Sequence, residues 1–216
     1  MNLFDQVQPK HRALLERLRA GNERFVQNVR SVESLISQSK RGALVDGQSP
    51  FAIILSCADS RAPSELLFDC GLGDLFVVRV AGNVVAPSIV GSVEFAASKF
   101  GTELVVVMGH THCGAISATL DALAGGPAAA SENLHDIVSR ISPALVGLAA
   151  SQTEGGESLL RRATRANICA ATDHLRHDSR ILERMVSDGS LLVVGAEYDL
   201  ETGRVEFFDG LGIPAD

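Results

Sequence analysis

The sequence predicts an α/β protein with a mainly parallel four-stranded sheet, an added edge strand, helices on both faces and an N-terminal helical arm. Four apolar runs have the length of strands, namely FAIILSC (51–57), LFVVRV (75–80), ELVVVMG (103–109) and SLLVVGA (190–196). Runs without polar alternation are typical of parallel strands buried on both faces. Helical patterns lie between these runs, and such alternation favours a parallel sheet. Finally, EYDLETGRVEFF (197–208) places a Thr-Gly turn between two β-rich stretches, which indicates a hairpin with an edge strand.

The first helix is expected over residues 11–30, where apolar residues recur at helical spacing. Gly21 is a weak point of this helix, because glycine costs about 1 kcal/mol relative to alanine inside a helix. Residues 1–45 are expected to form an arm or a cover, and residues 46–216 the α/β core of a single domain. The apolar stripe of the first helix consists of Leu14, Leu15, Leu18, Phe25, Val26 and Val29.

Further helices are expected between the strands. One follows the second strand, and another follows the third strand and ends at GGP (125–127). The next helical pattern meets Pro143, which kinks or breaks a helix, and a long helical tract is expected over residues 157–186. The apolar positions behind these patterns are Val93, Ala96, Ala97 and Phe100, then Ile116, Leu120 and Leu123, then Leu134, Ile137, Val138 and Ile141.

Composition and charge exclude several classes of function. The chain has 216 residues, of which 46% are hydrophobic and 21% charged, as in a compact globular domain. Its net charge of −7 opposes binding to nucleic-acid phosphates, and no apolar run reaches the roughly 18–20 residues that cross a bilayer. The first residues lack the pattern of a secretory signal. We therefore expect a cytoplasmic protein that binds neither nucleic acid nor membranes.

Metal-binding residue types stand at the ends of two predicted strands. CADSR closes the first strand and HTHCG closes the third. Because the carboxyl ends of parallel strands lie at one edge of a sheet, Cys57, His110 and Cys113 can converge. Two thiolates and one imidazole suit Zn²⁺, and three protein ligands leave one position open, as in catalytic zinc sites. For Cys57 alone, packing as a small buried side chain is an equal alternative.

The loop after the first strand also carries a carboxylate and a guanidinium. Asp59 can accept a hydrogen bond from a water molecule on the zinc, and Arg61 can hold that carboxylate ionised through a two-pronged contact. Capping of the following helix by Asp59 or Ser60 is the alternative. Cys70 and Cys169 have no comparable setting, so we expect them to be packing residues.

CADSR and HTHCG, with VVRVAGN (77–83) between them, resemble the β-class carbonic anhydrases, and the similarity extends from LERLRAGNERF (15–25) to SLLVVGAEYDLETGRV (190–205). The resemblance implies reversible hydration of CO2 to bicarbonate and a proton by a hydroxide on one Zn²⁺ per chain. The ligands would be Cys57, His110 and Cys113, with Asp59 and Arg61 as the catalytic dyad. It also implies an α/β fold with a four-stranded parallel core, and a homodimer or a dimer-based tetramer.

The resemblance to plant-type members further implies a substrate pocket formed by Gln48, Phe76, Phe95 and Gly114. Phe95 keeps an aromatic ring where those relatives have a tyrosine, but it lacks the hydroxyl group. In the family such residues come partly from the neighbouring subunit, so dimerisation and activity would be coupled. Ordinary core packing is the alternative for both phenylalanines.

Two other functions are compatible with these motifs. The same fold and metal could hydrolyse carbon disulfide or carbonyl sulfide, as related family members do. Alternatively, the chain could be a non-catalytic, zinc-stabilised interaction domain, which would require a fourth protein ligand and would tolerate changes at Asp59 and Arg61.

Overall fold

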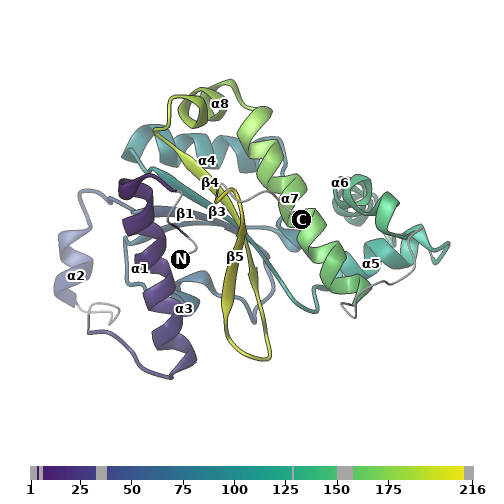
Figure 1. Ribbon diagram of the computed structural model, residues 1–216, viewed down its shortest axis with the longest axis horizontal. Helices are drawn as coiled ribbons and strands as arrows, with labels where there is room; N and C mark the ends of the chain where they lie inside the picture. The colour runs from purple at the N-terminus through teal and green to yellow at the C-terminus, as the bar shows by residue number, and fades with distance from the viewer. Residues whose placement is uncertain (1–3, 5–6, 33–37, 128, 150–157, 212–216) are drawn as a thin grey trace.

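The computed structural model describes residues 4, 7–32, 38–127, 129–149 and 158–211. Its centre is a five-stranded sheet in the order β2-β1-β3-β4-β5 (Figure 1). Strands β1 to β4 pair in parallel, and β5 pairs antiparallel with β4. The strands are β1 (Ala52–Ser56), β2 (Leu75–Arg79), β3 (Leu104–His110), β4 (Leu192–Tyr198) and β5 (Val205–Asp209). The predicted α/β fold, with a four-stranded parallel core and an added edge strand, is confirmed.

Helices cover both faces of the sheet (Figure 1). Helices α1 and α3 pack on one face, whereas α4, α7 and α8 pack on the other. Helices α5 and α6 lie beside α7, near the carboxyl end of β1. The helices are α1 (Pro9–Val26), α2 (Gln38–Ala43), α3 (Ser64–Leu67), the short 3₁₀ helix η1 (Ala81–Asn83), α4 (Pro87–Phe100), α5 (Gly114–Leu123), α6 (Glu132–Ala149), α7 (Leu159–His177) and α8 (Arg180–Ser187).

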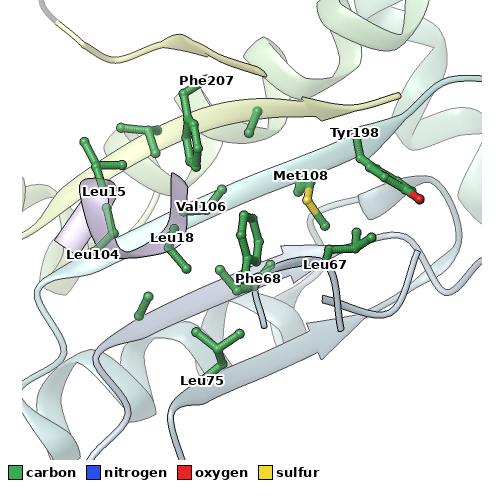
Figure 2. Packing of buried hydrophobic residues seen from close by; sticks show 14 of the residues in the cluster. Leu15, Leu18, Leu67, Phe68, Leu75, Leu104, Val106, Met108, Tyr198 and Phe207 are labelled. Carbon is green, nitrogen blue, oxygen red and sulfur yellow. The ribbon is translucent and has the colours of Figure 1, made fainter. Parts of the chain in front are cut away.

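The unbroken apolar strands are explained by burial on both faces. In β1, Ile54 belongs to the cluster beneath α1, whereas Ile53 and Leu55 belong to the cluster beneath α4 and α7, since successive side chains of a strand point to opposite faces. Figure 2 shows the first cluster, in which Leu15 and Leu18 of α1 lie over the sheet. This two-sided packing leaves the ends of the strands as the place for polar groups.

Helix α1 is a cover that is attached closely to the sheet. A Cβ atom at Gly21 would lie 1.9 Å from the carbonyl oxygen of Phe68, so glycine is required for the close approach of α1 to the end of α3. The next residue, Asn22, donates from Nδ2 to the Gly203 carbonyl at 3.0 Å and accepts at Oδ1 from the Val205 amide at 2.9 Å. The weak point expected at Gly21 is therefore a packing requirement.

The described part of the helical tract expected over residues 157–186 is helical, and it is divided into two helices. Helix α7 ends at His177, and α8 begins after Ser179, whose Oγ accepts a hydrogen bond from the Leu182 amide at 3.2 Å. This is an N-cap, and Glu183 in the first turn of α8 adds the favourable charge of a helix start.

Three smaller expectations concern Pro143, Val29 and Leu134. Helix α6 continues through Pro143 without a break, because Ile141 and Leu145 on either side are fully buried and tertiary packing outweighs the lost hydrogen bond. Val29 lies beyond the end of α1 and is 49% exposed, and Leu134 at the start of α6 is 50% exposed. Neither residue belongs to the buried stripe assigned to it.

Candidate metal centre and active site

The carboxyl ends of β1 and β3 bring together the three residues expected to bind metal. Cys57 directly follows β1, His110 is the last residue of β3, and Cys113 is the N-cap residue of α5. Their donor atoms lie within 4.8 Å of one another, and the two sulfur atoms are 4.0 Å apart. All three side chains are buried. They meet because β1 and β3 are parallel neighbours in the sheet.

The imidazole of His110 is oriented for metal binding. Its Nδ1 lies 2.8 Å from the carbonyl oxygen of Thr111. A carbonyl can only accept, so Nδ1 carries a proton, and in the neutral imidazole Nε2 then has the lone pair that a metal ion would bind. Nε2 is buried and has no hydrogen-bond partner within the described residues. A buried polar atom without a partner destabilises the folded state. A cation bound between Cys57, His110 and Cys113 would give this nitrogen a partner.

The contact between the two cysteines favours a single thiolate in the pair. A hydrogen bond from the Cys113 thiol lowers the pKa of Cys57 to about 4, and the same bond raises the pKa of Cys113. Backbone N–H groups at the start of α5 act in the opposite direction on Cys113, as expected at a helix N-terminus. The cluster thus already holds negative charge that a cation would neutralise.

These donors fit Zn²⁺. Sulfur ligands of a tetrahedral zinc ion, at about 2.3 Å from the metal, lie roughly 3.8 Å from each other, close to the 4.0 Å between the two cysteine sulfurs. Three ligands from the protein, two of them sulfur, correspond to a catalytic rather than a closed structural site. The orphaned Nε2 of His110 supplies the third donor.

The Asp59 carboxylate is held beside this cluster by Arg61. The guanidinium donates to both carboxylate oxygens, at 3.0 Å from Nε and 2.7 Å from Nη2, and the Arg61 amide adds a bond of 2.9 Å. Hydrogen bonding to Arg61 therefore keeps the pKa of Asp59 well below its usual range. Asp59 Oδ2 lies 3.7 Å from His110 Nε2. Capping of α3 by Asp59 or Ser60 is not observed, because its cap position has no side-chain hydrogen bond.

The predicted pocket residues are not all near these donors. Phe76 pairs with Ile53, four residues before Cys57, which is about 13 Å along the strand. Phe95 on α4 is 54% exposed, and its ring centroid lies 6.4 Å from that of Phe76. Gln48 is also exposed and lines a shallow pocket with Phe100.

Gly114 is the exception, because it directly follows the Cys113 position. It lines an apolar cavity of about 440 Å³ together with Ala81, Ala118 and Ile137. This cavity lies between η1, α5 and α6. Of the four expected pocket residues, the structure therefore places only Gly114 beside the chain's own metal-binding cluster.

Cys70 and Cys169 lie elsewhere, in agreement with their expected role in packing. Burial raises the pKa of Cys70 to about 12 and that of Cys169 to about 11. A thiol that stays protonated is a poor nucleophile and a poor metal ligand.

Arg79 and Asn167 contribute to the site although the sequence did not assign them to it. Arg79 at the end of β2 donates to the Cys57 carbonyl at 3.1 Å and to the Asp59 carbonyl at 2.5 Å. The Gly82 amide donates to Cys57 Sγ at 3.4 Å, and the Gly82 carbonyl accepts from Asn167 on α7 at 2.9 Å. The glycine in VVRVAGN was a signal for close backbone approach, but no local pattern indicates Asn167.

Comparison with known proteins identifies the family. The sequence profile of the family described as carbonic anhydrase matches residues 52–205. The solved structure of the β-carbonic anhydrase CcaA superposes with a TM-score of 0.71 and 26% identity, covering 93% of this chain and 96% of that one. The chain belongs to the β-class carbonic anhydrase family. The matched residues include the Cys57, His110 and Cys113 cluster and the Asp59–Arg61 pair.

Curated relatives support this membership over nearly the whole chain. This β-class member is 37% identical over 196 residues to carbonic anhydrase 2 of Mycobacterium tuberculosis, covering 90% of this chain and 91% of the relative. It is 37% identical over 195 residues to a carbonic anhydrase of Mycolicibacterium smegmatis, with coverage of 90% and 92%. A tetrameric β-carbonic anhydrase from Sordaria macrospora shares the fold, with a TM-score of 0.69, 21% identity and coverage of 92% and 95%.

Among the described residues, we find no helix with the length and hydropathy that spanning a membrane would require.

Proposed function

We propose that this carbonic anhydrase catalyses the zinc-dependent, reversible hydration of CO2 to bicarbonate and a proton, with one Zn²⁺ per chain bound by Cys57, His110 and Cys113. The observation that carries the proposal is the convergence of three buried donor atoms, within 4.8 Å, from two strand ends. Zinc in such a site lowers the pKa of water that it binds, so that a nucleophile is available near neutral pH.

Asp59 and Arg61 would orient that nucleophile. Asp59 Oδ2 accepts a hydrogen bond from the solvent nucleophile and so keeps a lone pair of that oxygen directed at CO2. The pKa of Asp59 is held low by Arg61, which means that the carboxylate accepts this hydrogen bond without taking the proton. Arg61 also donates to the carbonyl of His112 at 3.3 Å, and this contact ties the two loops of the site together.

The remaining pocket would be completed by a second copy of the chain. Phe76, Phe95 and Phe100 pack against one another along the sheet edge formed by β2, with tilted and edge-to-face ring contacts, and Phe95 remains 54% exposed. An exposed aromatic group of this kind is typical of an interface. We therefore propose a homodimer or a dimer-based tetramer in which Gln48, Phe76 and Phe95 serve the neighbouring site, while Gly114 serves its own.

This assembly can be tested by sedimentation velocity and activity together. Phe95→Asp should shift the chain toward the monomer and lower CO2 hydration while zinc stays bound. Ile181→Asp is the matched control, because Ile181 is a comparably exposed apolar residue, at 48%, on α8. If Phe95→Asp leaves the oligomer intact, the aromatic group is not the interface.

We also propose a cytoplasmic location and small-molecule substrates only. All four cysteines are unpaired, as is usual in a reducing compartment. The net charge of −7 opposes association with nucleic acids.

Metal analysis combined with stopped-flow CO2 hydration tests the reaction. We expect one zinc per chain and rapid hydration between pH 6 and 9 in the wild type. Asp59→Asn should keep the zinc and the stability but lose most of the hydration activity. Retained hydration in Asp59→Asn would contradict the role of Asp59. If the wild type hydrolyses carbon disulfide or carbonyl sulfide but does not hydrate CO2, the proposed substrate is wrong. A zinc-bound but inactive wild type would indicate an interaction domain.

A further inference from the structure

The short turn η1 makes direct contact with one of the expected zinc ligands. The backbone amide of Gly82 donates a hydrogen bond to Cys57 Sγ, with nitrogen and sulfur 3.4 Å apart. Gly82 and Asn83 both adopt positive φ angles, 65° and 45°. For Asn83 this is an uncommon backbone conformation, and such conformations persist where the surroundings impose them.

Asn167 holds this turn from the other side. It lies on α7, is 4% exposed, and donates from Nδ2 to the Gly82 carbonyl oxygen at 2.9 Å. Asn167 and Gly82 are 85 residues apart in sequence. The N–H and the carbonyl of Gly82 belong to the two peptide planes that meet at its Cα atom. An anchor on the carbonyl restricts the ψ angle of Gly82 and so restrains the orientation of the two planes relative to each other.

The neighbouring side chains leave the turn little freedom on its remaining side. A Cβ atom at Gly82 would lie 2.8 Å from Ile141 Cδ1 and 3.1 Å from Ala115 Cβ. Residue 82 is thus enclosed by α5 and α6, anchored by α7 and directed at the sulfur of Cys57. Loss of the anchor would free the ψ angle of Gly82 and loosen the turn that presents its N–H group, because no other side chain of the described residues donates to the Gly82 carbonyl.

We propose that Asn167 is a positioning residue for the metal centre: it aims the Gly82 N–H at Cys57 Sγ and thereby sets how much charge this sulfur donates to the metal. The inference rests on the proposed zinc site. A hydrogen bond to a ligand atom withdraws electron density from it, and such outer contacts commonly change metal affinity by about 10–100-fold.

The test compares Asn167→Ser and Asn167→Asp with the wild type and with Thr172→Val. Serine is too short to reach Gly82, and aspartate opposes its carbonyl with an oxygen. Thr172 is a matched control, because it is equally buried on α7 but donates to the Ile168 carbonyl of its own helix. Each chain is loaded with Co²⁺ for spectroscopy and with Zn²⁺ for release to a chelator.

Both Asn167 variants should move the sulfur-to-cobalt charge-transfer band to lower energy, because a sulfur without its hydrogen bond gives up an electron more easily. They should also release zinc about 10–100-fold faster, because the Cys57 sulfur is no longer held in its binding orientation, an effect that outweighs its stronger electron donation. Thr172→Val should match the wild type in both measurements. A folded Asn167→Ser chain with the wild-type band and a release rate within about twofold of the wild type would overturn the inference, since the expected change is at least about tenfold.

If neither variant folds, the wild-type chain loaded with ¹¹³Cd decides the question. Scalar coupling between ¹¹³Cd and the Gly82 amide proton supports the hydrogen bond that Asn167 is proposed to aim at Cys57 Sγ, and the absence of this coupling overturns the inference. The proposed function fails separately, when the wild type binds no metal or does not hydrate CO2. If the wild type binds zinc and hydrates CO2 but the Asn167 variants match it in both measurements, only the role of Asn167 is refuted.

Discussion

The loops at the carboxyl ends of β1 and β3 and the helices that flank the sheet contain the same kinds of side chain in different settings. In the loops, the hydrogen bond from Cys113 lowers the pKa of Cys57 to about 4. In the flanking regions, burial without such a donor raises the pKa of Cys70 to about 12 and of Cys169 to about 11. Convergent hydrogen-bond donors, rather than the residue type, make a cysteine available as a thiolate.

The Arg–Asp pairs give the same lesson. Arg61 contacts both oxygens of Asp59, and Arg140 on α6 contacts both oxygens of Asp136 in the same way. Hydrogen bonding to the arginine lowers the pKa of each aspartate. Only Asp59 also has an oxygen 3.7 Å from His110 Nε2. The same two-pronged ion pair therefore belongs to the metal centre only where, as at Asp59, it lies beside the metal-binding residues.

The largest expected effect separates the two kinds of cysteine. Cys57→Ser removes a thiolate ligand, so we expect loss of bound zinc and a fall in CO2 hydration of more than about a hundredfold, beyond the range for outer contacts. Cys169→Ser should keep both. Elemental analysis and stopped-flow assays measure the two quantities. Stoichiometric zinc in Cys57→Ser would break the comparison.

The second prediction concerns the charge of the metal-free chain. Because the pKa of Cys57 is lowered to about 4, its thiolate is populated above that pH and is lost on acidification below it. The ultraviolet absorbance of the metal-free protein should therefore show one thiolate at neutral pH that disappears near pH 4. The step should be absent in Cys57→Ser and unchanged in Cys169→Ser. A wild type without thiolate absorbance at neutral pH would contradict it.

A third prediction uses the two ion pairs. Lysine cannot reproduce the fork of contacts made by arginine, so Arg61→Lys should lower kcat of CO2 hydration about tenfold while zinc stays bound, at the lower end of outer-contact effects. The matched variant Arg140→Lys should have activity close to that of the wild type. Equal losses in both variants would mean that the loop pair has no special role.

The smallest expected effect concerns two glycines. Gly82 has a positive φ and close neighbours, so Gly82→Ala should lower the free energy of unfolding by about 1–2 kcal/mol. Gly91 lies inside α4 with open space around a Cβ atom, and Gly91→Ala should raise that free energy by about 1 kcal/mol. Urea unfolding measures both changes. A stabilising Gly82→Ala would show that the turn beside the metal ligands is not constrained.

Much of the fold could be predicted because buried strands are visible in the sequence as short, unbroken apolar runs. The unbroken apolar run before Cys57 and the run before His110 mark buried parallel strands, and parallel strands end at one edge, so the proposed ligands could be paired from the sequence. The boundary at Ser179 also has a local signal, because a serine at the N-cap and an acidic residue in the first turn are typical of the start of a helix.

Other features could not be predicted, because no pattern of neighbouring residues in the sequence indicates them. Asn167 reaches Gly82 because of the way α7 is rotated on the sheet, and its spacing resembles that of any polar residue within a helix. The resemblance suggested Gln48, Phe76 and Phe95 as pocket residues, but a single chain places them along the β2 edge, away from its own donors. Helix α6 runs through Pro143 because of the packing on both sides of that residue.

Hydrophobic periodicity and strand-end motifs in the chain already specify the order of elements, the parallel core and the three donors Cys57, His110 and Cys113, because these depend on neighbours within a few residues. Packing in three dimensions decides which thiol carries the charge, where Asp59 points and what holds Gly82. Those properties depend on distances of a few ångströms between segments far apart in sequence, and only the folded chain sets such distances.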